Sequence, residues 1–228
     1  MISRFIFNNH YIFSGLPQDD KDLLLQVMKT RKYRKNETIF TEGREPLGIF
    51  FVRSGKVKIY KADNDQREQI IYIYGTGEFF GYAAVLSESF YVGTTVAIES
   101  AVIGFISADD FMAVLKKSTV FTRLLLKSLS HEFIVMANLA AVLSQRTVRE
   151  RVALSLLILN DKYRNENESR EDVCITLSRR DLAKMAGTVS ETLARVLHDF
   201  KEEGLILAEG RKIQLLNFER LVYTVNFL

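Results

Sequence analysis

The chain has little of several features that would define other classes of protein. Its 228 residues include one cysteine, so no internal disulfide can form, and three histidines. No run of about 18 apolar residues predicts a membrane-spanning helix. The apolar N-terminus is interrupted too often by polar residues to act as a secretory signal. These absences favour a cytoplasmic protein that does not cross a membrane.

Features of common enzyme classes are also missing. The sequence contains no nucleophile–base pairing, no phosphate-binding glycine loop and no metal-ligand spacing, since His10, His131 and His198 are scattered. A jelly-roll enzyme of the cupin type remains an alternative, but it needs clustered histidine and acidic ligands on strands. The strand-rich part of this chain has no histidine beyond His10. We therefore expect neither an enzyme, nor a metal site, nor a bound cofactor.

The charge balance does not by itself point to a partner. The formal net charge is +3, and the part from Thr147 onward has 13 basic and 13 acidic residues. Hydrophobic residues make up 47% of the chain, enough for two modest cores. Any case for nucleic-acid binding must therefore come from how residues are arranged.

The region from Thr176 to Leu216 has the strongest local signals. Ser178 can cap a helix whose first turn contains Asp181, and Gly187 follows where the chain must turn without a Cβ penalty. A second capped helix is predicted to begin at Ser190. Its inward stripe consists of Leu193, Val196, Leu197 and Phe200.

A small hairpin is predicted after the second helix. Gly204 ends that helix, and the apolar runs Leu205–Leu207 and Lys212–Leu216 flank a turn at Gly210-Arg211. Two short capped helices, a glycine turn between them and a following hairpin are typical of a winged helix-turn-helix. The order of these elements favours DNA binding over an ordinary helical pair with a solvated charged face.

The second helix carries the predicted base-reading residues. Glu191 and Arg195 lie four residues apart on its exposed face, where arginine can bind guanine O6 and N7 and glutamate can accept from cytosine N4. The alternative is a surface salt bridge at helical spacing. Basic residues at 179, 180, 184, 211 and 212 can face phosphates. The predicted DNA-binding set is Arg179, Arg180, Thr188, Ser190, Glu191, Thr192, Arg195, Arg211 and Lys212.

Residues 1–108 show a different pattern of short apolar or alternating runs separated by turn residues. Such runs begin at Gly48, Lys56, Glu68, Phe90 and Ala101, roughly ten residues apart. This spacing predicts an antiparallel roll or barrel whose two sheets can enclose a pocket.

Residues 109–146 change to helical periodicity. An a/d-type seam alternates by three and four residues, as in a coiled coil. It consists of Leu126, Leu129, Phe133, Met136, Ala140 and Leu143. A simple buried helix is the alternative, but a long seam between the strand-rich part and the predicted DNA-binding helices favours a homodimer interface.

The chain resembles the Crp/Fnr family of bacterial transcription regulators over nearly its whole length. In that family a Glu is followed four residues later by an Arg in the recognition helix, as Glu191 and Arg195 are here. Ser190 stands where one branch has a base-reading Arg, which leaves the outer bases of the DNA site open. Residues 42–61 are similar to the front half of the family's sensor jelly roll. The run that begins at Arg146 resembles the family's hinge and the first helix of its DNA-binding domain.

The resemblance implies an α+β fold with three parts. These are an antiparallel jelly-roll sensor similar to a cyclic-nucleotide-binding domain (1–108), a dimerisation helix region (109–146) and a winged helix-turn-helix (147–228). It further implies a homodimeric regulator that binds an inverted-repeat operator and contacts RNA polymerase. Control by a small effector in the roll is a further expectation from the resemblance.

The cyclic AMP cassette of the family is not matched. Relatives that bind the nucleotide have a Gly-Glu pair for the ribose and an Arg-Ser or Arg-Thr pair for the phosphate. Here Tyr82 follows Gly81, and no Arg lies between Phe90 and Thr95. A buried phosphate would lack compensation, so cyclic AMP is not the expected effector. The candidate pocket residues are Tyr72, Phe80, Gly81, Tyr82 and Tyr91. Alternatively these aromatics are core, and the roll is a scaffold for an effector-independent regulator.

Iron chemistry is not expected either. Oxygen-sensing relatives use a cysteine cluster for an iron–sulfur centre, and Cys174 stands alone in a strand-like run. We expect it to be a small buried hydrophobe. For His131, a polar position near the seam is favoured over haem ligation.

Overall fold

The computed structural model describes residues 2–7, 9–65, 67–164, 168–170 and 172–225. They form two compact units, Phe7–Ile134 and Met1–Ile6 with Val135–Leu228. The division falls inside the helical segment predicted at 109–146, and each unit is described by itself below.

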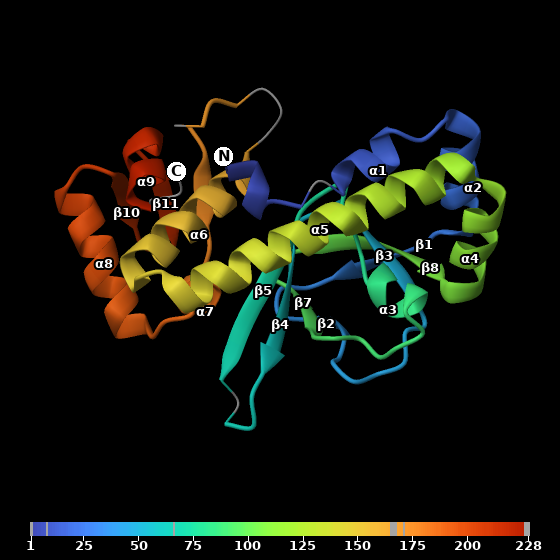
Figure 1. The fold of residues 1–228 in the computed structure, drawn as a ribbon, viewed down its shortest axis with the longest axis horizontal. Helices are drawn as coiled ribbons and strands as arrows, with labels where there is room; N and C mark the ends of the chain where they lie inside the picture. Colours follow the sequence, from blue (N-terminus) through green and yellow to red (C-terminus); the bar gives the residue numbers. More distant parts are fainter. Residues whose placement is uncertain (1, 8, 66, 165–167, 171, 226–228) are drawn as a thin grey trace. The chain divides into compact units, whose positions relative to one another are not determined.

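The first unit is built on two four-stranded antiparallel sheets (Figure 1). One has the order β1-β8-β3-β6 and the other β2-β7-β4-β5. The strands are β1 (Lys29–Tyr33), β2 (Thr38–Phe40), β3 (Gly48–Ser54), β4 (Val57–Ala62), β5 (Glu68–Tyr74), β6 (Phe79–Phe80), β7 (Thr94–Ala97) and β8 (Ala101–Ser107). This is the predicted jelly roll, and the fold-class prediction is confirmed.

Strand β3 shows why the roll has two buried layers. Ile49 and Phe51 belong to a cluster that includes helical residues such as Phe111 and Phe121. Phe50, between them, faces the other way, where its ring lies 5.3 Å from that of Phe40. Because successive strand residues point to opposite faces, a run apolar on both faces is covered on both sides.

Helices cover the outer face of the sheet that contains β3. They are α1 (His10–Ser14), α2 (Gln18–Val27), α4 (Ala108–Lys117) and the start of α5 (Thr119–Gln145), while α3 (Tyr82–Leu86) follows β6. The sequence pattern predicts one helical stretch after residue 108, but the structure breaks it at Ser118. The hydroxyl of Ser118 accepts from the Phe121 backbone N–H at 3.0 Å, so it begins a new helix as a cap.

Helix α5 is long and has a partly exposed apolar surface. By length and composition it could cross a membrane, with mean hydropathy 1.2 over an 18-residue window of which 22% is buried. This differs from the sequence analysis, which predicted no membrane-spanning helix. One helix of this kind is weak support for a membrane span, because helices in water-soluble proteins meet the same criterion.

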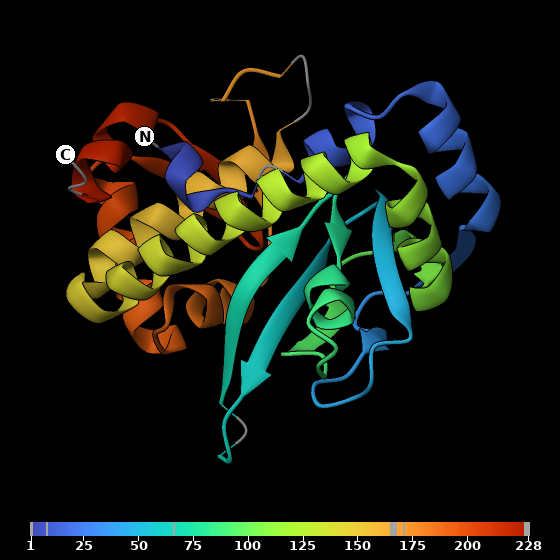
Figure 2. The same cartoon turned by 45° about the vertical axis from the view of Figure 1, so that its right-hand side comes forward.

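The second unit contains helices around a three-stranded sheet of order β10-β11-β9. Its elements are η1 (Ile2–Phe5), α6 (Val148–Tyr163), β9 (Cys174–Thr176), α7 (Arg179–Ala186), α8 (Ser190–Glu202), β10 (Ile206–Glu209), β11 (Lys212–Leu215) and α9 (Phe218–Val225). Figure 2 shows α7 and α8 as a pair of short helices. Thr147 and Glu150 form a capping box that fixes the start of α6.

Two local predictions differ from the structure. Cys174 is exposed, because it lies at the first position of β9, where side chains alternate exposed, buried, exposed. The run from Phe90 was predicted as strand, but β7 begins only at Thr94. Tyr91 instead exchanges backbone hydrogen bonds with the loop at Gly43 and Arg44 (2.9 and 3.0 Å), which takes this segment out of the sheet.

Candidate DNA interface and sensor cavity

The helix pair predicted to read DNA is present. The Ser178 hydroxyl accepts from the Asp181 backbone N–H at 3.0 Å and so caps α7. Gly187 ends α7 with φ +62°, the left-handed conformation that favours glycine. Helix α8 begins at Ser190, but the capping position is Val189 and has no side-chain cap. The predicted start at Ser190 is confirmed, but the predicted side-chain cap is wrong.

An arginine that sequence reasoning missed fixes the turn between the two helices. The Arg151 side chain, from α6, donates to the carbonyl oxygens of Ala186 (2.8 Å) and Gly187 (2.9 Å). These belong to the carbonyl groups that a helix C-terminus leaves without partners inside the helix. Arg151 also donates to the carbonyl oxygen of Arg146 at 2.8 Å. It thus holds the start of α6 and the turn before α8 in one arrangement.

Helix α8 has one buried and one exposed face. Leu193 and Phe200 are fully buried, whereas Glu191 and Arg195 are exposed. Among the described residues no ion pair joins Glu191 to Arg195. The Arg195 guanidinium instead donates to Thr192 Oγ1 at 3.3 Å. The salt-bridge alternative is therefore not the arrangement seen, and both charged groups are available on the surface.

The hairpin after α8 is the predicted wing. Strands β10 and β11 pair with Glu209 opposite Lys212, and Gly210 makes the turn with φ +53°. Arg211 and Lys212 at its tip are exposed, as is Arg180 on α7. These three cations could face phosphates as predicted.

Arg179 is placed differently from the other predicted phosphate ligands. It is half-buried, with one guanidinium nitrogen 3.4 Å from the Lys212 carbonyl oxygen, and burial lowers its pKa. Another of its nitrogens is buried without a hydrogen-bond partner among the described residues. Its position beneath the wing favours a role in joining α7 to the hairpin. Thr188 and Thr192 are half-buried near the start of α8.

The predicted effector residues mostly fill the interior of the roll. Tyr72, Phe80 and Tyr82 are each at most 2% exposed. The Tyr72 ring stacks on Phe7 with centroids 3.7 Å apart, and its hydroxyl oxygen accepts from the Phe7 backbone N–H at 2.6 Å. This end of the roll is packed rather than open.

Tyr82 is connected to the long helix. Its hydroxyl donates to the Glu132 carboxylate in α5, which also accepts from Asn9 (3.1 Å) and Ser128 (3.3 Å). Burial raises the pKa of Glu132 despite these donors, and burial together with Glu132 raises the pKa of Tyr82 well above 10.0. The phenol therefore stays protonated and donates. No local pattern around Glu132 singles it out, because its partners Tyr82 and Asn9 lie far away along the chain.

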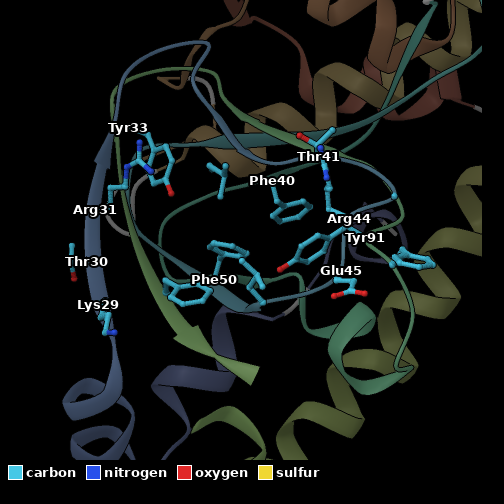
Figure 3. Close-up of a pocket in the computed structure, with 15 residues that line it drawn as sticks. Lys29, Thr30, Arg31, Tyr33, Phe40, Thr41, Arg44, Glu45, Phe50 and Tyr91 are labelled. Atoms are coloured by element: carbon cyan, nitrogen blue, oxygen red, sulfur yellow. The ribbon is translucent and has the colours of Figure 1, made fainter. Parts of the chain in front are cut away.

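A cavity of about 790 Å³ lies elsewhere in the roll, toward strands β1 and β2 (Figure 3). Of the five predicted pocket residues, Tyr91 lines it. The full lining is Lys29, Thr30, Arg31, Tyr33, Ile39, Phe40, Thr41, Gly43, Arg44, Glu45, Leu47, Phe50, Phe90, Tyr91 and Phe105. The volume falls within the range of small-molecule sites.

The predicted seam on α5 is largely exposed. Leu126, Phe133 and Leu143 are 60%, 76% and 44% exposed, Ala140 is exposed, and Leu129 and Met136 are partly so. Leu125, Val135 and Val142, which lie off the seam, are buried. The simple-buried-helix alternative therefore does not describe this face.

In the part of the chain that the structure covers, no group of three or more His, Cys, Asp or Glu side chains could hold a metal ion.

Family models match both halves of the chain. Residues 30–118 match a cyclic nucleotide-binding domain, and residues 150–223 match a Crp-like helix-turn-helix domain. The first covers most of the roll, and the second covers the helix pair and the wing. The match to the first model concerns the fold of the domain, because its nucleotide cassette is altered here.

Known proteins with the same organisation are regulators. The transcriptional activator protein anr of Pseudomonas aeruginosa is 28% identical over 89% of this chain and 83% of its own. The cyclic AMP receptor protein of Thermus thermophilus is 28% identical over 86% of this chain and 87% of its own. The structure of FixK2 from Bradyrhizobium japonicum has a TM-score of 0.76 at 24% identity, covering 87% of this chain and 97% of its own.

These relatives confirm the prediction of a regulator rather than an enzyme. The two domain matches, the relatives and the geometry of α7, α8 and the wing agree. The chain belongs to the Crp/Fnr family of DNA-binding transcription regulators.

Proposed function

We propose that this regulator acts in the cytoplasm as a homodimer that binds an inverted-repeat operator through two copies of α8. The observation that carries the proposal is the exposed face of α8, where Glu191 and Arg195 are exposed and form no ion pair with each other, beside a wing with exposed Arg211 and Lys212. Two recognition helices related by a two-fold axis enter successive major grooves about 34 Å apart. The half-sites should then lie about one helical turn apart.

Within each half-site the residues have different roles. Arg195 reads a guanine through O6 and N7, and Glu191 accepts from a cytosine amino group. We expect a TG-containing half-site with its CA complement. Arg180, Arg211 and Lys212 contact phosphates, which fix register and supply affinity that depends on salt. Thr188, Ser190 and Thr192 lie at the start of α8, where backbone and hydroxyl groups can approach the DNA.

Dimerisation is supported by the exposed stripe on α5. A contiguous exposed apolar face on a long helix is unusual for a monomer and typical of an interface. RNA polymerase is a further proposed partner, in keeping with the activator named among the relatives.

The test is selection of binding sites from random duplexes, followed by measurement of variants on the selected site. Arg195→Ala should weaken specific binding by roughly 1–3 kcal/mol and relax preference at one base pair. Lys212→Ala should lower affinity for all sequences and flatten its salt dependence. Lys201→Ala, an exposed lysine at the other end of α8, is the matched control and should change neither.

Two results would count against this function. Enriched sites without dyad symmetry would refute the dimeric operator. Equal losses for Arg195→Ala on cognate and scrambled duplexes would remove Arg195 from base reading.

A further inference from the structure

The cavity lined by Tyr91 and Phe50 has charged side chains beside its aromatic ones, unlike the packed interior around Tyr72 and Tyr82. On β1, Lys29 pairs with Phe105 of β8, which in turn pairs with Phe50 of β3. Directly opposed residues of antiparallel strands share a face, so Lys29 and the alternate residues Arg31 and Tyr33 face the same side as Phe50. An edge strand thus places two cations on the same side of the sheet as the aromatic residues, with both cations exposed at the rim of the cavity.

The floor of the cavity is aromatic. The rings of Phe40 and Tyr91 stack with centroids 3.9 Å apart and an interplanar angle of 15°. Phe50 lies 5.3 Å from both Phe40 and Phe105. Phe90, which also lines the cavity, is 56% exposed, so more than half of its surface is open to a ligand. These surfaces suit a flat apolar body, since aromatic rings prefer stacked or edge-on partners.

The rim of the cavity has an excess of positive charge. Arg31 is already engaged, because its guanidinium contacts Glu37 at 2.7 Å and lies over the Tyr33 ring. Lys29 and Arg44 make no ion pair or side-chain hydrogen bond among the described residues, and Glu45 is the acid in the lining. Figure 3 shows Arg44 beside Phe40 and Tyr91, on the side of the cavity opposite Arg31 and Tyr33. An inward charge on an edge strand can simply prevent strand pairing, but that does not account for Arg44, which lies outside β1.

We propose that this cavity is the effector site and that it binds a small organic anion with an aromatic body, such as an aryl carboxylate. The anion would lie at Arg44, with Lys29 as a second cation, and the aromatic body against Tyr91 and Phe50. A sugar phosphate fits less well, because a ribose placed against the rings of Phe40, Phe50 and Phe105 would have its hydroxyls facing apolar surface.

The floor of this cavity is linked to α5 through Gly81 and Tyr82. A Cβ on Gly81 would lie 3.2 Å from the Phe50 ring and 3.5 Å from the Tyr91 ring, so the chain at Gly81 packs closely against both. Gly81 caps α3, and the next residue, Tyr82, donates to Glu132 in α5. A ligand that shifts Tyr91 or Phe50 would therefore move α3 and the hydrogen bond to the long helix. The effect on DNA binding rests on the proposed function, whereas the binding site itself does not.

The binding test uses calorimetry on the full chain with 2-naphthoate, and with 2-naphthalenemethanol, octanoate and cyclic AMP as comparisons. 2-Naphthoate should bind at one site per chain, at least tenfold more tightly than each of the others. Arg44→Gln should weaken naphthoate binding at least tenfold. Arg67→Gln, which removes an exposed arginine in the β4–β5 hairpin outside the cavity lining, should not.

Equal binding of the neutral alcohol, equal binding of octanoate, tighter binding of cyclic AMP, or absence of naphthoate binding would each overturn the assignment. So would wild-type affinity in Arg44→Gln. None of these measurements needs DNA, so their failure is distinct from failure of the operator proposal.

The coupling test measures operator affinity with and without 2-naphthoate. Wild-type protein should change its operator affinity on saturation, because a ligand with different affinities for two states shifts their populations. Tyr82→Phe keeps the ring but loses the hydroxyl that reaches Glu132, so it should bind naphthoate normally and show a smaller change in operator affinity. An unreduced response in Tyr82→Phe would refute this route.

Discussion

Phe133 gives the sharpest test of the proposed dimer. Its side chain is 76% exposed in the single chain and lies on the α5 stripe with Leu126 and Leu143. Fully burying a phenylalanine contributes about 1.5–3 kcal/mol, so burying the exposed part contributes roughly 1–2 kcal/mol. A two-fold interface buries both copies, and Phe133→Ala should therefore weaken dimerisation by about 2–5 kcal/mol. That corresponds to roughly 30- to 3,000-fold in the dissociation constant.

Phe133→Asp should have a larger effect, because it would also bury a charge in an apolar interface. Sedimentation at several concentrations measures the monomer–dimer equilibrium, and circular dichroism checks that the variant is folded. Operator binding should fall with dimerisation, since each half-site needs one copy of α8. The matched control is Tyr223→Ala, which removes an aromatic ring that is 78% exposed on α9.

An unchanged dissociation constant for both Phe133 variants would show that the dimer interface does not include the exposed stripe on α5. A loss of equal size in Tyr223→Ala would show that exposed aromatic area, rather than the α5 stripe, holds the chains together.

Three further predictions concern stability and ligand response. Thr147→Ala removes the capping box of α6 and should cost about 1 kcal/mol in urea unfolding, and a loss below about 0.3 would contradict this role. The pKa of Glu132 is raised in the folded state, so ionising it disfavours folding and stability should fall as pH rises above about 4.5, its ordinary value. Glu132→Gln should flatten that slope in unfolding measured against pH, and an unchanged slope would exclude Glu132 as its source. Cyclic AMP should neither raise the melting temperature nor tighten operator binding, because no Arg lies between Phe90 and Thr95; saturable binding with tighter operator affinity would overturn this.

The winged helix-turn-helix was predictable because its determinants are local. Ser178 and Gly187 set the boundaries of α7 through a hydroxyl cap and a left-handed turn, both visible in sequence. The inward stripe of α8 follows from helical periodicity, and Leu193 and Phe200 are fully buried as expected. A side-chain cap for α8 was predicted because serine is a good capping residue. In the structure Val189 occupies the capping position, and Ser190 is already the first helical residue.

The roll was predictable as a class, but its interior was not. Alternation marks which residues face inward, and it correctly gave β3, β4, β5 and β8. It does not tell which inward aromatics pack together and which border open space. Tyr72, Phe80 and Tyr82 are buried in the packed interior of the roll, while Tyr91 lines a cavity.

The order of elements, the family and the likeness of α8 to a recognition helix can therefore be read from the amino-acid sequence, because capping, periodicity and turn chemistry act over a few residues. Three features depend on how the chain packs: Arg179 lies under the wing, Tyr82 reaches Glu132 from 50 residues away, and Lys29 and Arg44 border the same cavity. Each joins segments distant in sequence. Their proximity depends on strand pairing and packing across the whole sheet, which no local pattern contains.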